Sequence, residues 1–345
     1  MSGRERSSTK RNLSCAARTP GWPCAGHVSI TGLFIFTMDG YLSYYENCTL
    51  CPRNCHVNRL KDETGVCGSG ADLFVSRAAL HMWEEPCISG DTGSGTVFFS
   101  GCNLHCIFCQ NHEISGRSPF GKRITTERLC DIFWELEEKG ALNINLVTPT
   151  HYIPSVREAI IMAKRKGLSI PVVYNTGGYE SVSSLKLLEG LIDIYLPDLK
   201  YFDPVLSAGL SHADDYEKVA KDAIREMVRQ TGEPVFDENG LMKKGVIVRH
   251  LVLPSHTKDS IKILDYLHDT YKDRIYISIM SQYTPIEENC KFFDPFPELK
   301  RSLTKREYKK VIDHALMLDI KNGFTQEGKA ASESFIPSFK TLEGV

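Results

Sequence analysis

The stretch TVFFSGCNLHCIFC, residues 96–109, decides both the fold and the chemistry expected of this chain. It opens with a short apolar run typical of a buried strand, which ends at a serine and a glycine. Three cysteines follow at once with the spacing C-x3-C-x2-C: Cys102, Cys106 and Cys109, here called the cysteine triplet. Cysteines only two and three residues apart can converge on one metal centre, so this spacing favours metal ligation over disulfides.

Outward from this stretch, apolar β-rich runs alternate with helical patterns. The expected strands cover residues 96–99, 144–148, 171–175, 192–197, 246–253 and 275–280. The expected helices lie around residues 129–136, 155–166, 181–189, 216–227 and 258–270, with one more after a capping box formed by Thr304 and Glu307. Six strands with intervening helices predict an α/β fold with a parallel sheet. The pattern alone fits an open doubly wound sheet or a barrel, and both place function at the carboxyl ends of the strands.

The cysteine triplet fits two kinds of metal centre. A structural zinc ion needs four ligands, and the fourth would have to be Cys87, His105 or His112. A cubane cluster suits three thiolates better, because its fourth iron stays open for another ligand. We therefore expect a [4Fe-4S] cluster on the triplet.

A second group, here called the early cysteines, consists of Cys48, Cys51, Cys55 and Cys67. Four thiolates could close a tetrahedral zinc site or hold a second Fe-S cluster, and reduced buried thiols are the alternative. The remaining cysteines have no neighbours that suggest ligation and are expected to be plain thiols: Cys15, Cys24, Cys130 and Cys290.

Composition limits the classes of partner. The chain has 345 residues, a formal net charge of -2 and a pI near 6.6, so no global basic field indicates nucleic acid. No apolar run reaches the roughly 18 residues needed to cross a bilayer, so no membrane partner is expected. Metal-binding thiols imply a reducing compartment, and we expect the cytoplasm.

The first 37 residues differ from the rest, with five basic residues against the single acid Glu5. We expect a disordered extension, or translation begun upstream of a start at Met38; the alternative is a mitochondrial transit peptide. The expected organisation is this extension over 1–37, a Cys-rich segment over 38–90, a barrel over 91–300, and a C-terminal helix and tail over 301–345.

The C-x3-C-x2-C spacing, with Phe108 before the last cysteine, resembles the signature of radical S-adenosylmethionine (radical SAM) enzymes. That resemblance implies a partial (β/α)6 TIM-type barrel. It also implies that the open iron binds the amino and carboxylate groups of S-adenosylmethionine. One electron, from a donor such as flavodoxin or ferredoxin, then cleaves the cofactor to methionine and a 5'-deoxyadenosyl radical, which abstracts a hydrogen atom from the substrate.

The sequence is most similar to the pyruvate-formate-lyase-activating-enzyme-like branch. The matching stretches are CTLCPRNC (48–55), WEEPCISG (83–90), NTGGYE (175–180), YLPDLK (195–200) and VRHLVLP (248–254). The branch implies an oxidoreductase that acts on a protein substrate and installs a glycyl radical.

Residue roles follow from the resemblance, position by position. It places Asn175, Thr176, Gly177 and Gly178 beside the cofactor. It implies that Lys200 contacts the cofactor carboxylate or orients Asp198, with an ion pair at the strand end as the alternative. Arg249, a charge inside an apolar strand, needs a partner and is implied to face the cofactor.

The sequence also departs from activating enzymes. Asn175 replaces an aspartate, Gln282-Tyr283 replaces a late histidine, and Thr148-Pro149-Thr150-His151 replaces a Gly-Gly-Glu-type turn that holds the cofactor's amino group. His151 is expected to take over that polar role, with a surface loop histidine as the alternative. Two other functions stay open: a structural zinc-binding interaction module, and an Fe-S protein for electron transfer or sensing.

Overall fold

The computed structural model describes residues 40–286, 292–326, 337–339 and 341–345. The extension expected over residues 1–37 lies outside the described residues, as do Cys15, Cys24 and Cys290.

Six parallel strands form the centre of the fold, and each pairs with the next in chain order. They are β2 (Ser94–Phe99), β4 (Ile144–Val147), β5 (Val172–Thr176), β6 (Ile194–Pro197), β8 (Met242–Leu251) and β9 (Tyr276–Met280). All six strands predicted from the sequence are present. The sheet does not close, because its path ends at β10 (Gly323–Thr325), parallel to β9, and at β3 (Lys122–Ile124). The fold is therefore a partial TIM-type barrel.

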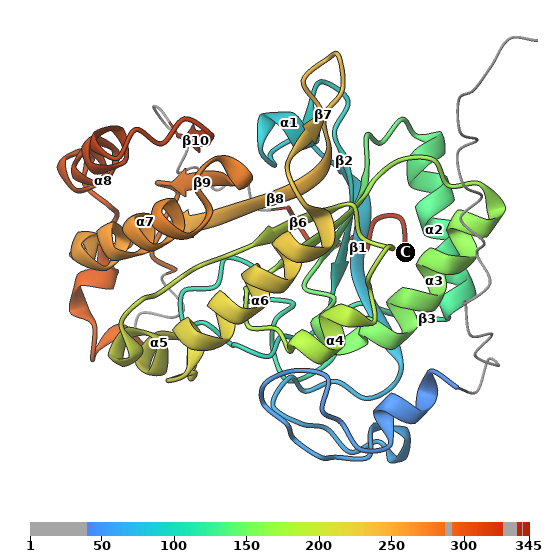
Figure 1. The fold of residues 1–345 in the computed structure, drawn as a ribbon. Helices are drawn as coiled ribbons and strands as arrows, with labels where there is room; N and C mark the ends of the chain where they lie inside the picture. The colour runs from blue at the N-terminus through green and yellow to red at the C-terminus, as the bar shows by residue number, and fades with distance from the viewer. Residues whose placement is uncertain (1–39, 287–291, 327–336, 340) are drawn as a thin grey trace, which may run out of the picture. The chain divides into compact units, whose positions relative to one another are not determined.

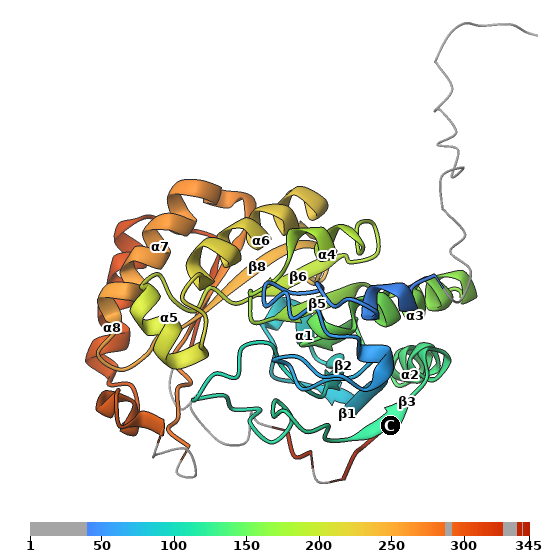
Figure 2. The same cartoon turned by 90° about the horizontal axis from the view of Figure 1, so that it is seen from below.

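Helices between the strands cover the outer side of the curved sheet (Figures 1 and 2). They are α2 (Thr126–Glu138), α3 (Ile153–Lys166), α4 (Val182–Lys186), α5 (Pro204–Ser211), α6 (Tyr216–Thr231), α7 (Thr257–Tyr271) and α8 (Lys305–Met317). Their apolar faces form the core: Leu129, Ile132 and Phe133 of α2 are at most 1% exposed. The capping box predicted at Thr304 and Glu307 starts α8.

One side of the sheet was not predicted. Strand β1 (Leu73–His81) runs antiparallel to β2, with His81 opposite Ser94, and β3 pairs with β1. The short helix α1 (Pro86–Ser89) connects β1 to β2, and β7 (Val235–Phe236) forms a hairpin with β8.

The described part of the C-terminal tail, residues 337–339 and 341–345, returns to this antiparallel edge. The Ala78 amide donates to the Glu343 carbonyl at 2.8 Å. The ring of Phe339, 1% exposed, lies 5.3 Å from that of Phe98. The tail thus joins the β1–β2 edge, although β10 extends the opposite edge of the sheet.

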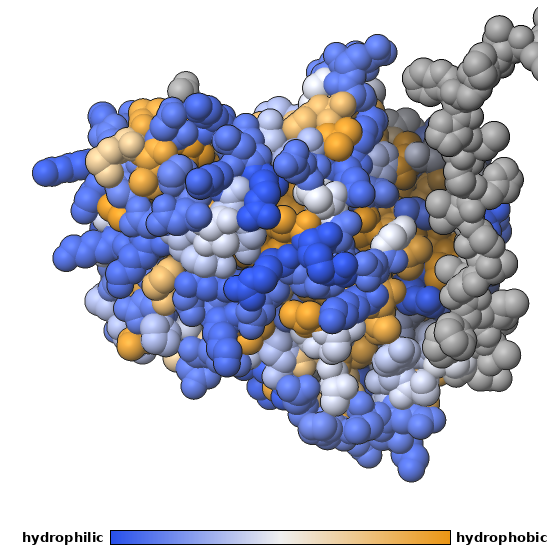
Figure 3. Space-filling view, in the orientation of Figure 1, coloured by the Kyte–Doolittle hydropathy of each residue, from blue (hydrophilic) through white to orange (hydrophobic). Residues whose placement is uncertain are grey.

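The face shown in Figure 3 is mostly hydrophilic, with scattered apolar patches. Among the described residues, no helix combines the length and the apolar character needed to span a membrane.

Candidate functional site

The cysteine triplet lies in the loop that leaves the carboxyl end of β2. The loop turns at Gly101 and His105, whose φ angles are +92° and +51°. The Cys106 sulfur accepts a hydrogen bond from Ser211 Oγ at 2.9 Å, and the Cys102 sulfur lies 3.4 Å from the Leu104 amide nitrogen. Burial, with Cys106 and Cys109 as further causes, raises the pKa of Cys102 to about 12. The bare Cys102 thiol is therefore neutral, and a metal would have to displace its proton.

All three triplet cysteines line one cavity, with a volume of about 240 Å³, that reaches into the barrel. The polar and charged side chains that share it come from the triplet loop, from the end of β1 and the loop after it, and from the ends of the neighbouring strands: Gln110, Asn111, His81, Glu84, Thr148, Asn175, Thr176, Asp198, Lys200, Arg249 and Gln282. Trp83 lines it as well and is 58% exposed, so it lies at the opening. The cavity thus joins a candidate cluster site to a polar chamber.

Three charged side chains form a chain of ion pairs across this chamber. Asp198 Oδ1 accepts from Arg249 Nε at 3.0 Å, and Asp198 Oδ2 accepts from Lys200 Nζ at 2.5 Å. Burial would raise the pKa of Asp198, but Lys200 and Arg249 hold it below its usual value. Burial would lower the pKa of each base, but Asp198 raises both. All three groups are therefore charged.

Glu84 is the site residue whose role the sequence did not reveal. Its Oε2 lies 3.3 Å from Arg249 Nη1, and its Oε1 accepts from the side-chain amides of Asn145 at 2.9 Å and Asn175 at 3.2 Å. Burial raises the pKa of Glu84, whereas Arg249 opposes that shift. The partner that Arg249 was expected to need is thus a pair of carboxylates, Asp198 and Glu84.

The residues of the NTGG stretch have two different positions: the first three line the cavity, and the fourth lies behind it. Asn175, Thr176 and Gly177 line the cavity, and Asn175 Oδ1 accepts from Arg249 Nη2 at 2.6 Å. Gly178 does not line it; its φ is +82°, and a side chain there would collide with the Asp198 carbonyl oxygen. Gly178 therefore permits the close approach of two loops.

His151 lies outside the cavity, contrary to the expected contact with the cofactor's amino group. It is 1% exposed, so it is not a surface histidine either, and its Nε2 donates to the Ser100 carbonyl at 2.7 Å. Burial, with Arg59 as a further cause, lowers its pKa to about 3. A neutral His151 thus supports the backbone just before the triplet.

Two of the fourth ligands considered for zinc at the triplet, His105 and Cys87, are directed elsewhere. His105 Nε2 donates to the Val66 carbonyl at 2.7 Å. Cys87 packs with Val173 and Ile194 in a separate apolar cluster. In the part of the chain that the structure describes, no three His, Cys, Asp or Glu side chains are arranged to hold a single metal ion.

The early cysteines lie outside the cavity. Cys48, Cys51 and Cys67 are buried, at 8%, 8% and 7% exposed, and Cys55 is partly exposed. Their segment, the blue ribbon in Figure 1, lies beside the carboxyl ends of the barrel strands. Cys130 is fully buried in α2, apart from both groups.

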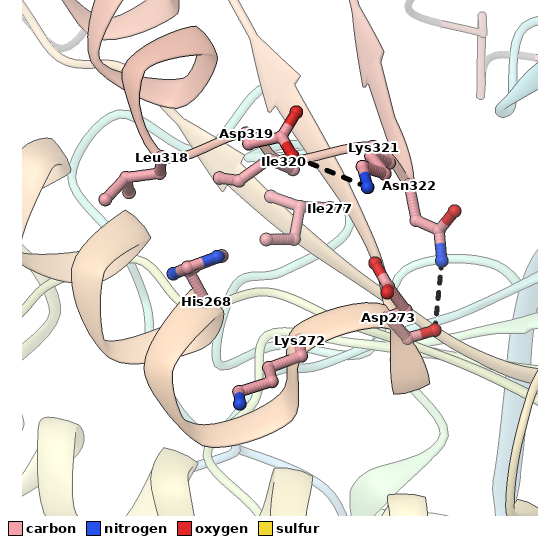
Figure 4. A pocket seen from close by; sticks show the side chains of 9 residues that line it. All are labelled: His268, Lys272, Asp273, Ile277, Leu318, Asp319, Ile320, Lys321 and Asn322. Atoms are coloured by element: carbon pink, nitrogen blue, oxygen red, sulfur yellow. Dashed lines mark hydrogen bonds and ion pairs between the residues drawn. The ribbon is translucent and has the colours of Figure 1, made fainter.

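A second hollow, of about 160 Å³, lies between the end of α7 and the segment after α8 (Figure 4). It is lined by His268, Lys272, Asp273, Ile277, Leu318, Asp319, Ile320, Lys321 and Asn322. Its charged pair, Lys321 and Asp319, is exposed and 3.4 Å apart. It contains no cysteine, and we assign it no role.

Comparison with known families agrees with this geometry. The family model described as "Radical SAM superfamily" matches residues 96–267, from β2 into α7. An uncharacterized protein of Methanocaldococcus jannaschii, MJ0674, is 30% identical over 79% of this chain and 75% of its own length. A second uncharacterized protein of that organism, MJ0808, is 24% identical over 64% of this chain and 65% of its own length.

Solved structures show weaker likeness. Streptococcus suis SuiB bound to precursor peptide SuiA aligns with a TM-score of 0.46 and 17% identity, over 66% of this chain and 47% of that chain. A domain of pyruvate-formate lyase-activating enzyme from Bacteroides vulgatus aligns with a TM-score of 0.36 and 10% identity, over 51% of this chain and 92% of that chain. This chain thus spans about half the length of the SuiB chain.

Proposed function

Because this chain belongs to the radical SAM superfamily, we propose that it reductively cleaves S-adenosylmethionine at a [4Fe-4S] cluster on the cysteine triplet. The observation that carries the proposal is the shared cavity. It brings three thiols at a strand end together with the partly buried Lys200, Arg249 and Asp198 from the ends of two other barrel strands. When bound, the cluster and cofactor supply a 5'-deoxyadenosyl radical that abstracts a substrate hydrogen atom.

The triplet fits such a cluster. Each thiolate of a cubane binds a different iron, so the sulfurs do not need to surround one point. The Ser211 hydroxyl, which donates to the Cys106 sulfur, would help to stabilise a charged thiolate.

The charged chamber fits the amino-acid part of the cofactor. Lys200 lines the same cavity as Cys102, Cys106 and Cys109, so its ammonium group shares this space with the cluster ligands. We assign Lys200 to the cofactor carboxylate, as a compact cation whose position is fixed by Asp198. Arg249 would hold Asp198 and Asn175 in place through its hydrogen bonds to their side-chain oxygens. Thr176 and Gly177 supply the adjacent wall.

The resemblance to activating enzymes supports a finer proposal: an oxidoreductase whose hydrogen donor is a glycine of a protein substrate. Exposed Trp83 at the cavity opening gives a polypeptide an apolar surface to contact. The required electron would come from a flavodoxin or ferredoxin. At Asn175 and His151 the sequence differs from activating enzymes. The identity of the hydrogen donor is therefore tested separately from cofactor cleavage.

Single alanine variants of the triplet test the main proposal. Each should lose the absorbance of the cluster near about 400 nm and the release of 5'-deoxyadenosine under reductant, because each removed thiolate leaves one iron without its protein ligand. Cys130→Ala is the matched control, since it removes a buried thiol outside the site. A triplet variant with a full cluster and full cleavage would overturn the assignment.

The hydrogen donor is tested separately by transfer of deuterium. Candidate proteins carrying deuterated glycine should label 5'-deoxyadenosine if the finer proposal is right. Cofactor cleavage without such transfer, while another donor transfers its label, would reject the glycine proposal alone.

A further inference from the structure

The early cysteines pack directly against the loop that carries the cysteine triplet. His105, inside the triplet loop, donates to the Val66 carbonyl at 2.7 Å, one residue before Cys67. Arg53 Nε, between Cys51 and Cys55, donates to the Asn103 carbonyl at 2.9 Å. The two cysteine groups, far apart in the sequence, are therefore held together by hydrogen bonds from both sides.

The two cysteine groups also approach each other at Gly101, which precedes Cys102. A Cβ atom there would lie 3.0 Å from the carbonyl oxygen of Cys67 and would collide with the Ser69 hydroxyl. Only a residue without a side chain allows this contact. The backbone of the last early cysteine thus touches the residue adjoining the first cysteine of the triplet.

The four early thiols occupy one small fold. The Cys48 amide donates to the Val57 carbonyl and the His56 amide donates back to the Cys48 carbonyl, both at 3.0 Å, which closes the loop that holds Cys51 and Cys55. Cys48, Cys51 and Cys67 are buried in it, each at most 8% exposed. The Cys55 sulfur lies 3.4 Å from the Val66 amide nitrogen, which brings it beside Cys67.

A buried cation lies beside these thiols. Arg59 is 1% exposed, and its Nη1 is 3.9 Å from the Cys48 sulfur. Its guanidinium donates to the carbonyl oxygens of Gly70 and His151 and lies 4.5 Å from the centre of the Tyr45 ring. Within the described ranges no carboxylate pairs with it. Burying an uncompensated charge is costly, so a nearby anion is expected.

Metal-bound thiolates would supply that negative charge, whereas plain thiols would not. Zinc would require the sulfurs to lie about 2.3 Å from one point. The early cysteines lie directly against the triplet loop, through the contact at Gly101 and the hydrogen bonds of His105 and Arg53. A cluster can exchange electrons across this contact, whereas zinc has no redox chemistry, so the position favours a cluster.

We propose that the early cysteines hold an iron–sulfur cluster of their own, and that this cluster passes electrons to the one on the triplet. The relay is balanced: a flavodoxin- or ferredoxin-class donor reduces the early cluster by one electron, and the same electron moves to the triplet cluster. No bond forms or breaks in the relay itself. The relay rests on the proposed function, because its electron acceptor is the triplet cluster. The assignment of a cluster to the early cysteines does not depend on that function.

Metal analysis tests the early cluster independently of catalysis. The triple variant Cys102→Ala, Cys106→Ala, Cys109→Ala should keep about half the iron of the wild-type chain, with the electron paramagnetic resonance signal of a reduced cluster. The double variant Cys48→Ala, Cys51→Ala should keep the triplet's iron, and Cys87→Ala should keep both sets. A triple variant that is free of iron, or that holds zinc instead, would overturn the early cluster.

The choice of reductant tests the relay. In Cys48→Ala, Cys51→Ala, 5'-deoxyadenosine formation driven by reduced flavodoxin should fall at least about tenfold relative to Cys87→Ala. With dithionite, which can reach the triplet cluster through the cavity, the two variants should differ little. Equal rates with flavodoxin would reject the relay. A wild-type chain that holds both clusters but releases no 5'-deoxyadenosine would reject the proposed function. The assignment of a cluster to the early cysteines would remain supported.

Discussion

Arg249 and Asp198 form an ion pair inside the barrel, with Nε and Oδ1 3.0 Å apart. The two residues lie side by side on neighbouring strands, where the backbone of Asp198 also bridges to that of Arg249. Because the second oxygen of Asp198 holds Lys200, this one carboxylate fixes both cations of the chamber.

Asp198→Asn should destabilise the protein by about 3 kcal/mol, because it leaves two partly buried cations short of one negative charge. Denaturant unfolding of the anaerobic holoprotein measures the effect. The matched control is Asp131→Asn, whose ion pair with Lys166 is exposed and should contribute little. A similar decrease in the free energy of unfolding in both variants would show that the Asp198 carboxylate does not stabilise the two cations.

Lys200→Met should weaken binding of S-adenosylmethionine by about tenfold or more, because it removes a charged hydrogen-bond donor from the cofactor carboxylate. The iron content should not change, since Lys200 is not a cluster ligand. Equilibrium binding measures the affinity, and Lys243→Met, in the β7–β8 hairpin, is the control. Unchanged affinity in Lys200→Met would remove Lys200 from the cofactor site.

Glu180 predicts a pH dependence of stability. Burial raises its pKa from 4.5 to about 7, although hydrogen bonds from Thr150, Thr176 and Tyr174 oppose the shift. Between these two pH values the folded state holds more protons at Glu180 than the unfolded state does. The contribution of Glu180 to the free energy of unfolding must therefore fall as pH rises from about 4.5 to about 7, and then level off.

Glu180→Gln should remove this penalty. Its free energy of unfolding relative to wild type should increase over that pH window and remain constant above it. Glu138→Gln, at an exposed position of α2, should show no such trend. A difference between Glu180→Gln and wild type that does not vary with pH would show that Glu180 titrates normally.

Arg59 should tune the early cluster. Reduction adds a negative charge, which the adjacent guanidinium stabilises, so Arg59→Met should make the reduction potential of that cluster more negative. Arg59→Lys keeps the charge and should shift the potential less. A redox titration followed by electron paramagnetic resonance measures both, with the exposed Arg123→Met as control. An unchanged potential in Arg59→Met would mean that Arg59 does not act on a cluster.

Phe339→Ala should cost about 3 kcal/mol of stability or release the tail to proteolysis, because it empties a buried position against Phe98. Pro337, two residues earlier, lines the cavity, so the tail forms part of its wall. Leu316→Ala, 70% exposed in α8, is the control for loss of an apolar side chain. A tail that resists proteolysis equally well in both variants, with equal stability, would contradict the packing of Phe339 against Phe98.

The parallel strands and the triplet loop could be predicted because their signals are local. Strands buried on both faces are nearly continuous apolar runs, and the triplet follows the first of them directly. Strand β1 was missed because Ser76 and Arg77 interrupt its apolar pattern and its partners are antiparallel. His151 was misplaced because the sequence does not show that it turns toward Ser100 rather than toward the cavity.

The site features that could not be predicted from the sequence depend on contacts between residues far apart in the chain. Glu84 lies in an irregular segment between β1 and α1, and its partners are 61, 91 and 165 residues away. Nothing in the local sequence tells such a glutamate from a surface one. The approach of the early cysteines to Gly101 is equally invisible, since it depends on how the segment folds over the ends of the strands.

The most direct test of the account is a single-turnover assay of the reconstituted, anaerobically reduced full chain with S-adenosylmethionine. We predict equal amounts of methionine and 5'-deoxyadenosine, with one electron consumed for each cofactor cleaved, and neither product from the triple alanine variant of the cysteine triplet. A wild-type chain that holds a complete, reduced cluster on the triplet, binds the cofactor and leaves it intact would contradict the account.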